Sequence, residues 1–392
     1  MTLLIAYVAA VVFAVSSAIT LVVYLLWRGH LAFWGRRLLA EGSYAEVEQL
    51  TMPDGGSVTL RRLALHGEPT TGERMPVLLV HGLAMNHQCL DLGEASLARS
   101  LQREGFDVWL VTLRSGRTYL SPFGPRTSTF AAMVEHDLPR AVDIILERTG
   151  KPQLDIMGLS MGGMLLYASL GRSLSADKVH RVVLFGSPGQ IRPLGLLNLS
   201  RFMPAALALS VPLRAMIRTV AFAPRLVPGL VWRRLYNPAN MERQFERHML
   251  WNVWEGIPGQ LGREFVLWSA ANGVVSANRA PVLAGLAQVD VPVLFFAGSV
   301  DWLAPVHSVR AAYEAWGSGL PMVEKQFVVL GRETSGATCD YGHCDLVLGQ
   351  RAHTEAFEPA ARFLRADARP RTFVSSPAPK PGSVSTPLAL EA

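Results

Sequence analysis

The most apolar stretch of the chain lies at its start. From Thr2 to Trp27 there is no charged side chain, and Leu, Ile, Val, Ala and Phe dominate. A helix of about 26 residues, at roughly 1.5 Å per residue, is long enough to cross a hydrocarbon core of about 30 Å. Aromatic residues typical of a membrane interface lie near its C-terminal end: Tyr24, Trp27 and Trp34. The pattern predicts a transmembrane anchor over residues 1–27 and a basic, aromatic neck over residues 28–45.

A cleaved signal peptide is the competing interpretation of this run, since Ser16-Ser17-Ala18 is an acceptable cleavage site. Signal peptides usually begin with basic residues, however, and no Lys or Arg precedes Arg28. Arg28, Arg36 and Arg37 follow the run closely. Because positive residues flank the cytoplasmic side of membrane spans, we expect a single-pass protein whose body lies in the cytoplasm.

After the neck, short apolar runs alternate with helical segments. Glu46–Thr51 and Val58–Leu65 are predicted strands joined by a hairpin turn at Pro53-Asp54-Gly55-Gly56. Further strands are predicted at Val77–Val80, Val108–Leu113, Leu154–Met157, Val182–Phe185, Val293–Ala297 and Gln326–Leu330. Predicted helices include one capped by Asp137 and closed by Gly150, one over Met161–Leu170 and one from about Thr354 to Leu364. This alternation predicts an α/β fold with a mostly parallel, doubly wound sheet.

One long segment interrupts the alternation. Residues 188–278 are rich in Leu, Met, Trp and Pro and suggest several helices without a core strand. Because loops of that length are rarely unstructured in a compact domain, we interpret the segment as an inserted helical cap. The core then comprises residues 46–187 and 279–366, and the Pro-, Ser- and Ala-rich tail over residues 367–392 is predicted to be disordered.

Composition narrows the classes of partner. The chain has 392 residues, of which 50% are hydrophobic and 17% charged, and its net charge of +6 comes almost wholly from scattered arginines. No basic stripe suggests nucleic acid, so the bilayer is the expected macromolecular partner. The three cysteines, Cys89, Cys339 and Cys344, form no disulfide framework and have no metal-ligand spacing. We expect neither a metal nor a cofactor.

Candidate chemistry begins at Gly158-Leu159-Ser160-Met161-Gly162, which matches the G-x-S-x-G pattern of a nucleophile elbow. A serine on a tight strand-to-helix turn adopts strained backbone angles, and small neighbours avoid clashes there. The predicted strand before this motif and the helix after it supply the context that the pentapeptide alone lacks. Ser160 is therefore the candidate nucleophile, and the competing interpretation is a structural Gly/Ser turn.

A second loop closes the earlier strand at His81-Gly82-Leu83. Backbone N–H groups at such a position stabilise an oxyanion together with the N–H after the nucleophile. We therefore predict an oxyanion hole made by the N–H groups of Leu83 and Met161. His81 is interpreted as a histidine that shapes the loop rather than one that transfers protons.

The acid and the base are expected after later strands. Asp301 follows the predicted strand Val293–Ala297, whereas Asp290 precedes it and would lie at the wrong edge of the sheet. His343 lies on a loop after the last predicted strand. A histidine there can take the Ser160 proton while a carboxylate holds its ring in the productive tautomer. A helix N-cap is the alternative role of Asp301.

Together these motifs resemble the α/β-hydrolase superfamily, and in particular the acid lipases and the hydrolase domain fused to some bacterial cholesterol oxidases. The resemblance is carried by Gly105–Leu110, His136–Pro139, Gly298–Ala304 and Tyr341–Asp345, and extends over about residues 46–366. It implies hydrolysis of a lipid-like ester, with Ser160 as nucleophile, Asp301 as acid and His343 as base. Leu113–Arg117 departs from the family's Arg-Gly arrangement.

The leading hypothesis is thus a membrane-anchored serine esterase or lipase without a cofactor. A thioesterase or an acyltransferase with the same triad is an alternative within enzymes, because only the acceptor of the acyl group differs. A non-catalytic scaffold that keeps the fold is the alternative outside enzymes, although no triad residue is missing.

Overall fold

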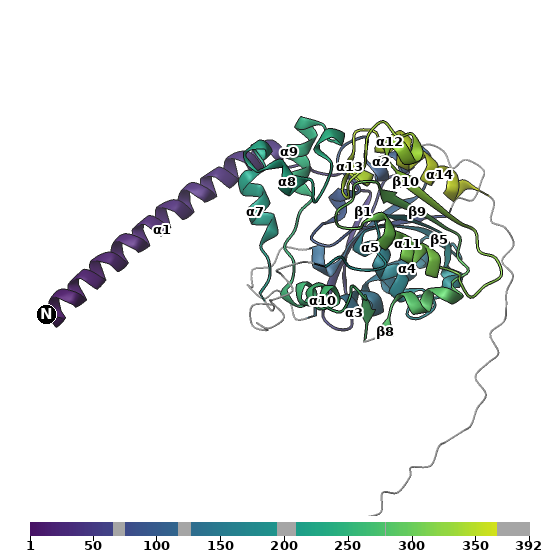
Figure 1. Cartoon of the computed structure of the whole chain (residues 1–392), viewed down its shortest axis with the longest axis horizontal. Helices are drawn as coiled ribbons and strands as arrows, with labels where there is room; N and C mark the ends of the chain where they lie inside the picture. The colour runs from purple at the N-terminus through teal and green to yellow at the C-terminus, as the bar shows by residue number, and fades with distance from the viewer. Residues whose placement is uncertain (66–74, 117–126, 194–208, 279, 367–392) are drawn as a thin grey trace, which may run out of the picture.

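Eight strands form one sheet at the centre of the molecule, in the order β1-β2-β4-β3-β5-β6-β9-β10 (Figure 1). The computed structural model describes residues 1–65, 75–116, 127–193, 209–278 and 280–366. The strands of this sheet are β1 (Glu46–Thr51), β2 (Ser57–Arg62), β3 (Val77–Val80), β4 (Val108–Thr112), β5 (Leu154–Leu159), β6 (Val179–Phe185), β9 (Val293–Gly298) and β10 (Lys325–Leu330). β2 pairs antiparallel with β1 and with β4, and the remaining neighbours are parallel. The predicted α/β fold with a mostly parallel sheet is confirmed.

Each face of the sheet carries its own apolar core, because successive residues of a strand point to opposite faces. Leu78 and Phe295 belong to one core, and their neighbours Leu79 and Phe296 belong to the other. The first core is covered by α4 (Leu138–Thr149), α5 (Met161–Ser169) and α11 (Val306–Ala315), and the second by α2 (Leu97–Arg103), α13 (Asp345–Leu348) and α14 (Glu358–Arg365). Since helices cover both faces, every residue of β3, β5 and β9 is buried.

The hairpin between β1 and β2 turns where the sequence predicts. Gly55 lies in this turn with φ of 79°, a conformation that glycine adopts without steric cost. β2 ends at Arg62, three residues before the predicted end at Leu65. The strand ends early because its partner β4 begins only at Val108, whose carbonyl accepts the N–H of Leu63 at 3.0 Å.

The prediction that Asp137 caps a helix is wrong. α3 (Phe130–Ala132) continues through a π turn at Met133–Asp137 directly into α4, so Asp137 lies within a continuous helical segment and caps nothing. Its buried carboxylate instead pairs with Arg114, with Oδ1 to Nη2 at 2.5 Å. Arg114 also pairs with Asp54 in the β1–β2 turn. A buried guanidinium between two carboxylates thus joins the hairpin to α4.

The segment between β6 and β9 is helical, as expected of a cap. Its described elements include α7 (Leu213–Val220), α8 (Gly229–Trp232), α9 (Arg243–Asn252) and α10 (Gly259–Ala270). Within the described residues, 188–278 contribute no strand to the main sheet; β7 (Ser276–Ala277) pairs only with β8 (Ala280–Pro281). α7, α8 and α9 lie near the end of α1 (Figure 1).

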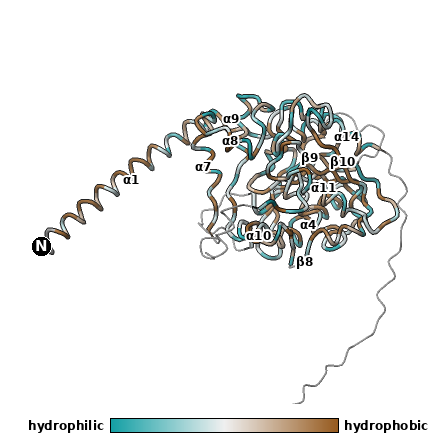
Figure 2. The backbone as a smooth tube through the Cα atoms, in the orientation of Figure 1, coloured by the Kyte–Doolittle hydropathy of each residue, from teal (hydrophilic) through white to brown (hydrophobic). Residues whose placement is uncertain are grey.

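α1 (Thr2–Leu38) projects from the body for most of its length (Figure 1) and is apolar along the projecting part (Figure 2). It is long and apolar enough to cross a membrane, a test that a signal sequence also passes. The helix continues through the predicted neck, where a packed face recurs about once per turn at Trp27, His30, Trp34 and Leu38. The tail predicted over residues 367–392 lies outside the described part of the chain.

Candidate active site

Ser160 lies on the sharp turn between β5 and α5. Its backbone has φ of 53° and ψ of −117°, which is strained for a residue with a side chain. The flanking glycines are needed because the neighbouring backbone leaves no room for a side chain. A Cβ atom on Gly158 would lie 2.7 Å from the N atom of Gly163, and one on Gly162 would clash with the carbonyl of Val80. The turn leaves the Ser160 side chain half-buried at the carboxyl edge of the sheet.

The predicted oxyanion donors come from two elements that meet at this turn. A Cβ atom on Gly82 would lie 3.1 Å from the Ser160 Cβ, so the loop after β3 packs directly against the elbow. Leu83 follows on that loop, and Met161 is the first residue of α5. Within the described part of the chain, neither N–H donates to a protein acceptor. Both are therefore available to a negatively charged oxygen.

Asp301 and His343 form a bonded pair. Asp301 Oδ2 lies 2.7 Å from His343 Nδ1, and both side chains are buried. Because a carboxylate only accepts, Nδ1 donates the proton of this bond, and Nε2 takes no part in it. The other oxygen, Oδ1, accepts the N–H groups of Leu303 and Ala304 at 2.8 Å each. These bonds fix the carboxylate in a turn, and α11 begins only at Val306, so Asp301 is not a helix N-cap.

The turn after β6 brings this pair to Ser160. The Ser160 N–H donates to the carbonyl of Phe185 at 2.8 Å. The next residue, Gly186, has φ of 51°, and a Cβ atom there would lie 3.2 Å from both Asp301 Oδ2 and His343 Nδ1. Among the described residues, no hydrogen bond joins the Ser160 hydroxyl to the His343 ring. Such contacts are often long in unliganded sites and tighten when substrate binds.

His81 is buried and shapes the loop. Its Nε2 accepts the Leu113 N–H at 3.0 Å, so Nδ1 carries the proton and donates to the Gly82 carbonyl at 2.8 Å. Burial lowers the pKa of His81 to about 4. A Cβ atom on Gly116 would lie 2.7 Å from His81 Nε2, so Gly116, in the sequence that departs from the family's Arg-Gly arrangement, packs against this ring. Both ring nitrogens are thus engaged, which leaves no site for proton transfer.

Two buried carboxylates beside the site do not stand out in the sequence. Glu255, in the cap, accepts the Asn86 side-chain amide on the loop that carries Leu83. Asp345, two residues after His343, accepts three hydrogen bonds and is fully buried. The only sequence signal for Asp345 is its place in the histidine motif, and Glu255 has none because its partners are distant in the chain.

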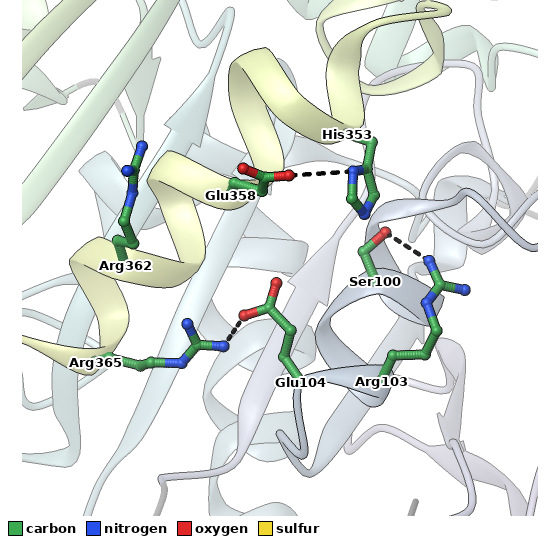
Figure 3. Close-up of a pocket in the computed structure, with 7 residues that line it drawn as sticks. All are labelled: Ser100, Arg103, Glu104, His353, Glu358, Arg362 and Arg365. Carbon is green, nitrogen blue, oxygen red and sulfur yellow. Dashed lines mark hydrogen bonds and ion pairs between the residues drawn. The ribbon is translucent and has the colours of Figure 1, made fainter.

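Two further cavities lie at other places on the surface. One, of about 450 Å³, is a charged groove between α2 and α14 that contains the ion pairs His353–Glu358 and Arg365–Glu104 (Figure 3). The other, of about 590 Å³, borders α10 and contains Glu264, whose pKa burial raises to about 7. Neither cavity is lined by a residue of the predicted triad.

Metal-ligand chemistry has no candidate in the described residues. No group of three or more His, Cys, Asp or Glu side chains there is placed to hold a metal ion. Cys89 and Cys344 are buried, Cys339 is half-buried, and all three are free thiols. Burial raises the pKa of both the Cys89 and the Cys344 thiols, so neither is poised as a nucleophile.

This site geometry agrees with a family assignment. A family model described as the alpha/beta hydrolase fold matches residues 75–332, well over half of the chain. The chain belongs to the α/β hydrolase fold family. The α/β hydrolase chain also resembles acid lipases, as its motifs predict. It is 30% identical to the gastric triacylglycerol lipase of Bos taurus over 162 residues, which are 38% of this chain and 39% of that lipase.

Other relatives support the same comparison. Identity to human lipase member K is 33% over 169 residues, 40% of this chain and 39% of the lipase. The chain thus spans about two fifths of the length of the lipases it matches. A soluble variant of the monoglyceride lipase of Saccharomyces cerevisiae superposes with a TM-score of 0.54 at 14% identity, over 83% of this chain and 97% of that one. A thermophilic esterase from Thermogutta terrifontis superposes with a TM-score of 0.53 at 18% identity, over 82% of this chain and 100% of that one. These structures show a shared fold.

Proposed function

We propose that this α/β hydrolase is a serine hydrolase that cleaves carboxylic esters through an acyl-enzyme on Ser160. The observation that carries the proposal is the 2.7 Å bond between Asp301 and His343, next to a serine with strained backbone angles. A buried acid–base pair beside a strained, half-exposed hydroxyl is the arrangement that activates a weak nucleophile. The N–H groups of Leu83 and Met161, which donate to no acceptor in the described part of the chain, supply the matching oxyanion site.

In this mechanism His343 Nε2 accepts the Ser160 proton as Oγ attacks the carbonyl carbon of the ester. The oxygen that becomes negative accepts hydrogen bonds from the N–H groups of Leu83 and Met161. As the tetrahedral intermediate collapses, His343 gives the proton to the departing alcohol, and the acyl group stays on Ser160. A water molecule then repeats the cycle and releases the acid. Asp301 holds the ring and stabilises its charged form throughout.

The relatives named as lipases favour a lipid ester as substrate. The apolar composition of the cap, residues 188–278, agrees with a long acyl group. An acyltransferase or a thioesterase would use the same residues and differ only in the group that accepts or leaves. The described residues hold no feature that favours either activity over hydrolysis.

We also propose that α1 anchors the protein in a membrane and that its last turns belong to the body. The large exposed apolar side chains between Ile5 and Leu26 have exposed fractions of 42% or more, so the described part of the protein does not cover them. From Trp27 onward the helix packs on the cap: Trp27 Nε1 donates to Thr219 Oγ1 at 2.9 Å, and the rings of Trp34 and Phe222 stack. A substrate dissolved in the bilayer would then be concentrated near the cap. A signal peptide cut after Ala18 would leave these docked turns in place.

Labelling with a fluorophosphonate probe tests the proposal without knowledge of the substrate, because the probe reacts only with an activated serine. The intact protein should be labelled in detergent micelles, and Ser160→Ala should abolish labelling. Ser187→Ala is the matched control, since Ser187 is a fully buried serine near the elbow whose hydroxyl bonds to backbone carbonyls. Unchanged labelling of Ser160→Ala, or no labelling of the folded wild type, would refute the assignment.

A further inference from the structure

The loop that carries His343 is bonded to one short segment of the cap. The Cys344 N–H donates to the carbonyl of Leu235 at 2.8 Å, and the Gln350 N–H donates to that of Asn240 at 3.0 Å. The Asn237 side-chain amide donates to the carbonyl of Asp340 at 2.7 Å. These bonds join the cap segment to the chain between Asp340 and Gln350, which is called the histidine loop below. The cap segment over residues 235–240 and the histidine loop form one packed unit.

Asp345 lies at the centre of this unit. Its Oδ1 accepts the Asn237 N–H at 3.0 Å, and its Oδ2 accepts the Gly342 N–H at 2.9 Å and the Asn240 amide at 3.0 Å. The side chain is completely buried and forms no ion pair with a described residue. A Cβ atom on Gly342 would lie 2.9 Å from both Asp345 Oδ1 and the Asn237 N atom, so the contact is close.

A buried carboxylate without a cation is costly, and burial raises the pKa of Asp345 to about 6. If residue 345 served only to fill space, an apolar side chain would do so at a lower cost in free energy. What the carboxylate adds is two bonds to backbone N–H groups, one of them on Gly342, the residue before His343. Bonds from a fixed carboxylate to backbone define a loop more sharply than apolar packing does, since they are directional.

We propose that Asp345 is a positioning residue for His343 and that Asn240 is the cap's contribution to the same device. Seating of the cap segment on Asp345 holds the histidine ring between Asp301 and Ser160. Asp345 touches neither substrate nor the reacting atoms, so it acts only through His343. The role in turnover rests on the proposed function, whereas the effect on the ring does not.

Asp345→Asn tests the inference, because an amide of the same shape places N–H donors against N–H donors. We expect kcat on a short p-nitrophenyl ester to fall about 10- to 100-fold with KM within about twofold, as small misplacements of catalytic groups do. Asn240→Ala removes one donor to Asp345 but keeps the N–H groups of Asn237 and Gly342 bonded to it, so it should lower kcat by a smaller factor. Asp155→Asn is the control: Asp155 is an equally buried carboxylate that pairs with His180 at 2.8 Å, at the opposite end of β5. It should leave kcat unchanged.

The proton between His343 and Asp301 gives a readout independent of turnover. In the wild type in micelles, this Nδ1–H should appear as a low-field proton resonance that His343→Ala removes. Asp345→Asn and Asn240→Ala should shift or broaden it, and Asp155→Asn should not. If Asp345→Asn lowers only the melting temperature while kcat and the resonance stay unchanged, the inference is wrong. If the wild type shows the resonance and its response but no esterase activity, the proposed function fails and the positioning role stands.

Discussion

Asn86, on the loop after β3, donates its side-chain amide to Glu255 in the cap at 2.9 Å. The backbones of the two segments are also bonded: the Asn86 N–H reaches the carbonyl of Val253 at 3.1 Å, and the Glu255 N–H reaches that of Ala84 at 2.8 Å. The cap therefore holds the loop of the predicted oxyanion donor Leu83 as well as the loop of His343. Both loops depend on residues more than a hundred positions away.

Replacement of Glu255 by alanine should weaken the oxyanion loop. The change leaves the buried Asn86 amide one acceptor short, and it removes the carboxylate that binds Arg214 at 2.8 Å. We expect a loss of about 2–4 kcal/mol in the free energy of unfolding and a fall in kcat. Glu324→Ala, which removes the ion pair between Glu324 and the buried Arg181, is the control for stability. Equal kcat in the two variants would contradict a role for Glu255 at the site.

Substitution within the triad should separate the three roles. Ser160→Ala and His343→Ala should each lower kcat by about 10⁴-fold or more, because nucleophile and base act as one unit. Asp301→Asn should retain slightly more activity, since the ring survives in a poorer orientation. Circular dichroism and melting temperature establish that each variant is folded. Near-wild-type hydrolysis of a p-nitrophenyl ester by Ser160→Ala would overturn the assignment.

The buried His81 predicts an acid-sensitive fold. Its pKa is about 4 in the native protein and about 6.5 when unfolded, so between these values the unfolded state binds more protons. Its contribution to stability is complete above pH 6.5 and is lost as the pH falls from 6.5 to 4, by about 1.4 kcal/mol per pH unit. His87, whose pKa burial lowers to about 2, adds in the same direction.

The test is urea unfolding of the wild type and of His81→Asn in micelles at several pH values. The variant should be less stable at pH 7, because the Leu113 N–H loses its acceptor. Its stability should fall less steeply below pH 6.5 than that of the wild type. Parallel pH profiles for the two proteins would show that His81 takes up a proton in the native state as well.

Truncation of α1 should depend on where the cut is made. Deletion of residues 1–26 removes the exposed apolar turns and should give a soluble protein that still hydrolyses short esters. Deletion of residues 1–37 also abolishes the stacking of Trp34 on Phe222. It disturbs Leu38 as well, whose carbonyl accepts the Asn252 side-chain amide at 2.7 Å. We expect the longer deletion to lower the melting temperature by roughly 5 °C or more relative to the shorter one. Equal melting temperatures would mean that the docked turns add nothing to the fold.

The arginines in the C-terminal part of α1 predict the membrane topology. Arg28, Arg36 and Arg37 come directly after the apolar turns, so the body should lie in the cytoplasm. Protease added to intact cells should leave the body undigested, and permeabilised cells provide the control for accessibility. Digestion from outside would reverse the orientation. Recovery of the full-length protein in a salt-washed soluble fraction would exclude the anchor.

Several features could be predicted from the sequence because they depend on local order along the chain. β3 and the first five residues of β9 are continuous apolar runs, and such runs identify strands buried on both faces. The elbow at Ser160 could be predicted as well, since its two flanking glycines are needed by contacts within the same turn and with the adjacent β3. Asp301 and His343 followed from their places after predicted strands, and the structure pairs them.

The sequence by itself determined the strands, the tight turn at Ser160 and the order of the candidate acid and base, because periodicity and neighbouring residues encode them. Only the tertiary structure decided what partners the buried charges have. Asp137 suits a helix cap in the sequence, but the fold places Arg114 against it and continues the helix through it. Asp345 and Glu255 likewise acquire their roles from cap residues or loops far along the chain. A buried charge is stable only with the partners that folding brings to it, and those partners are not encoded by its neighbours.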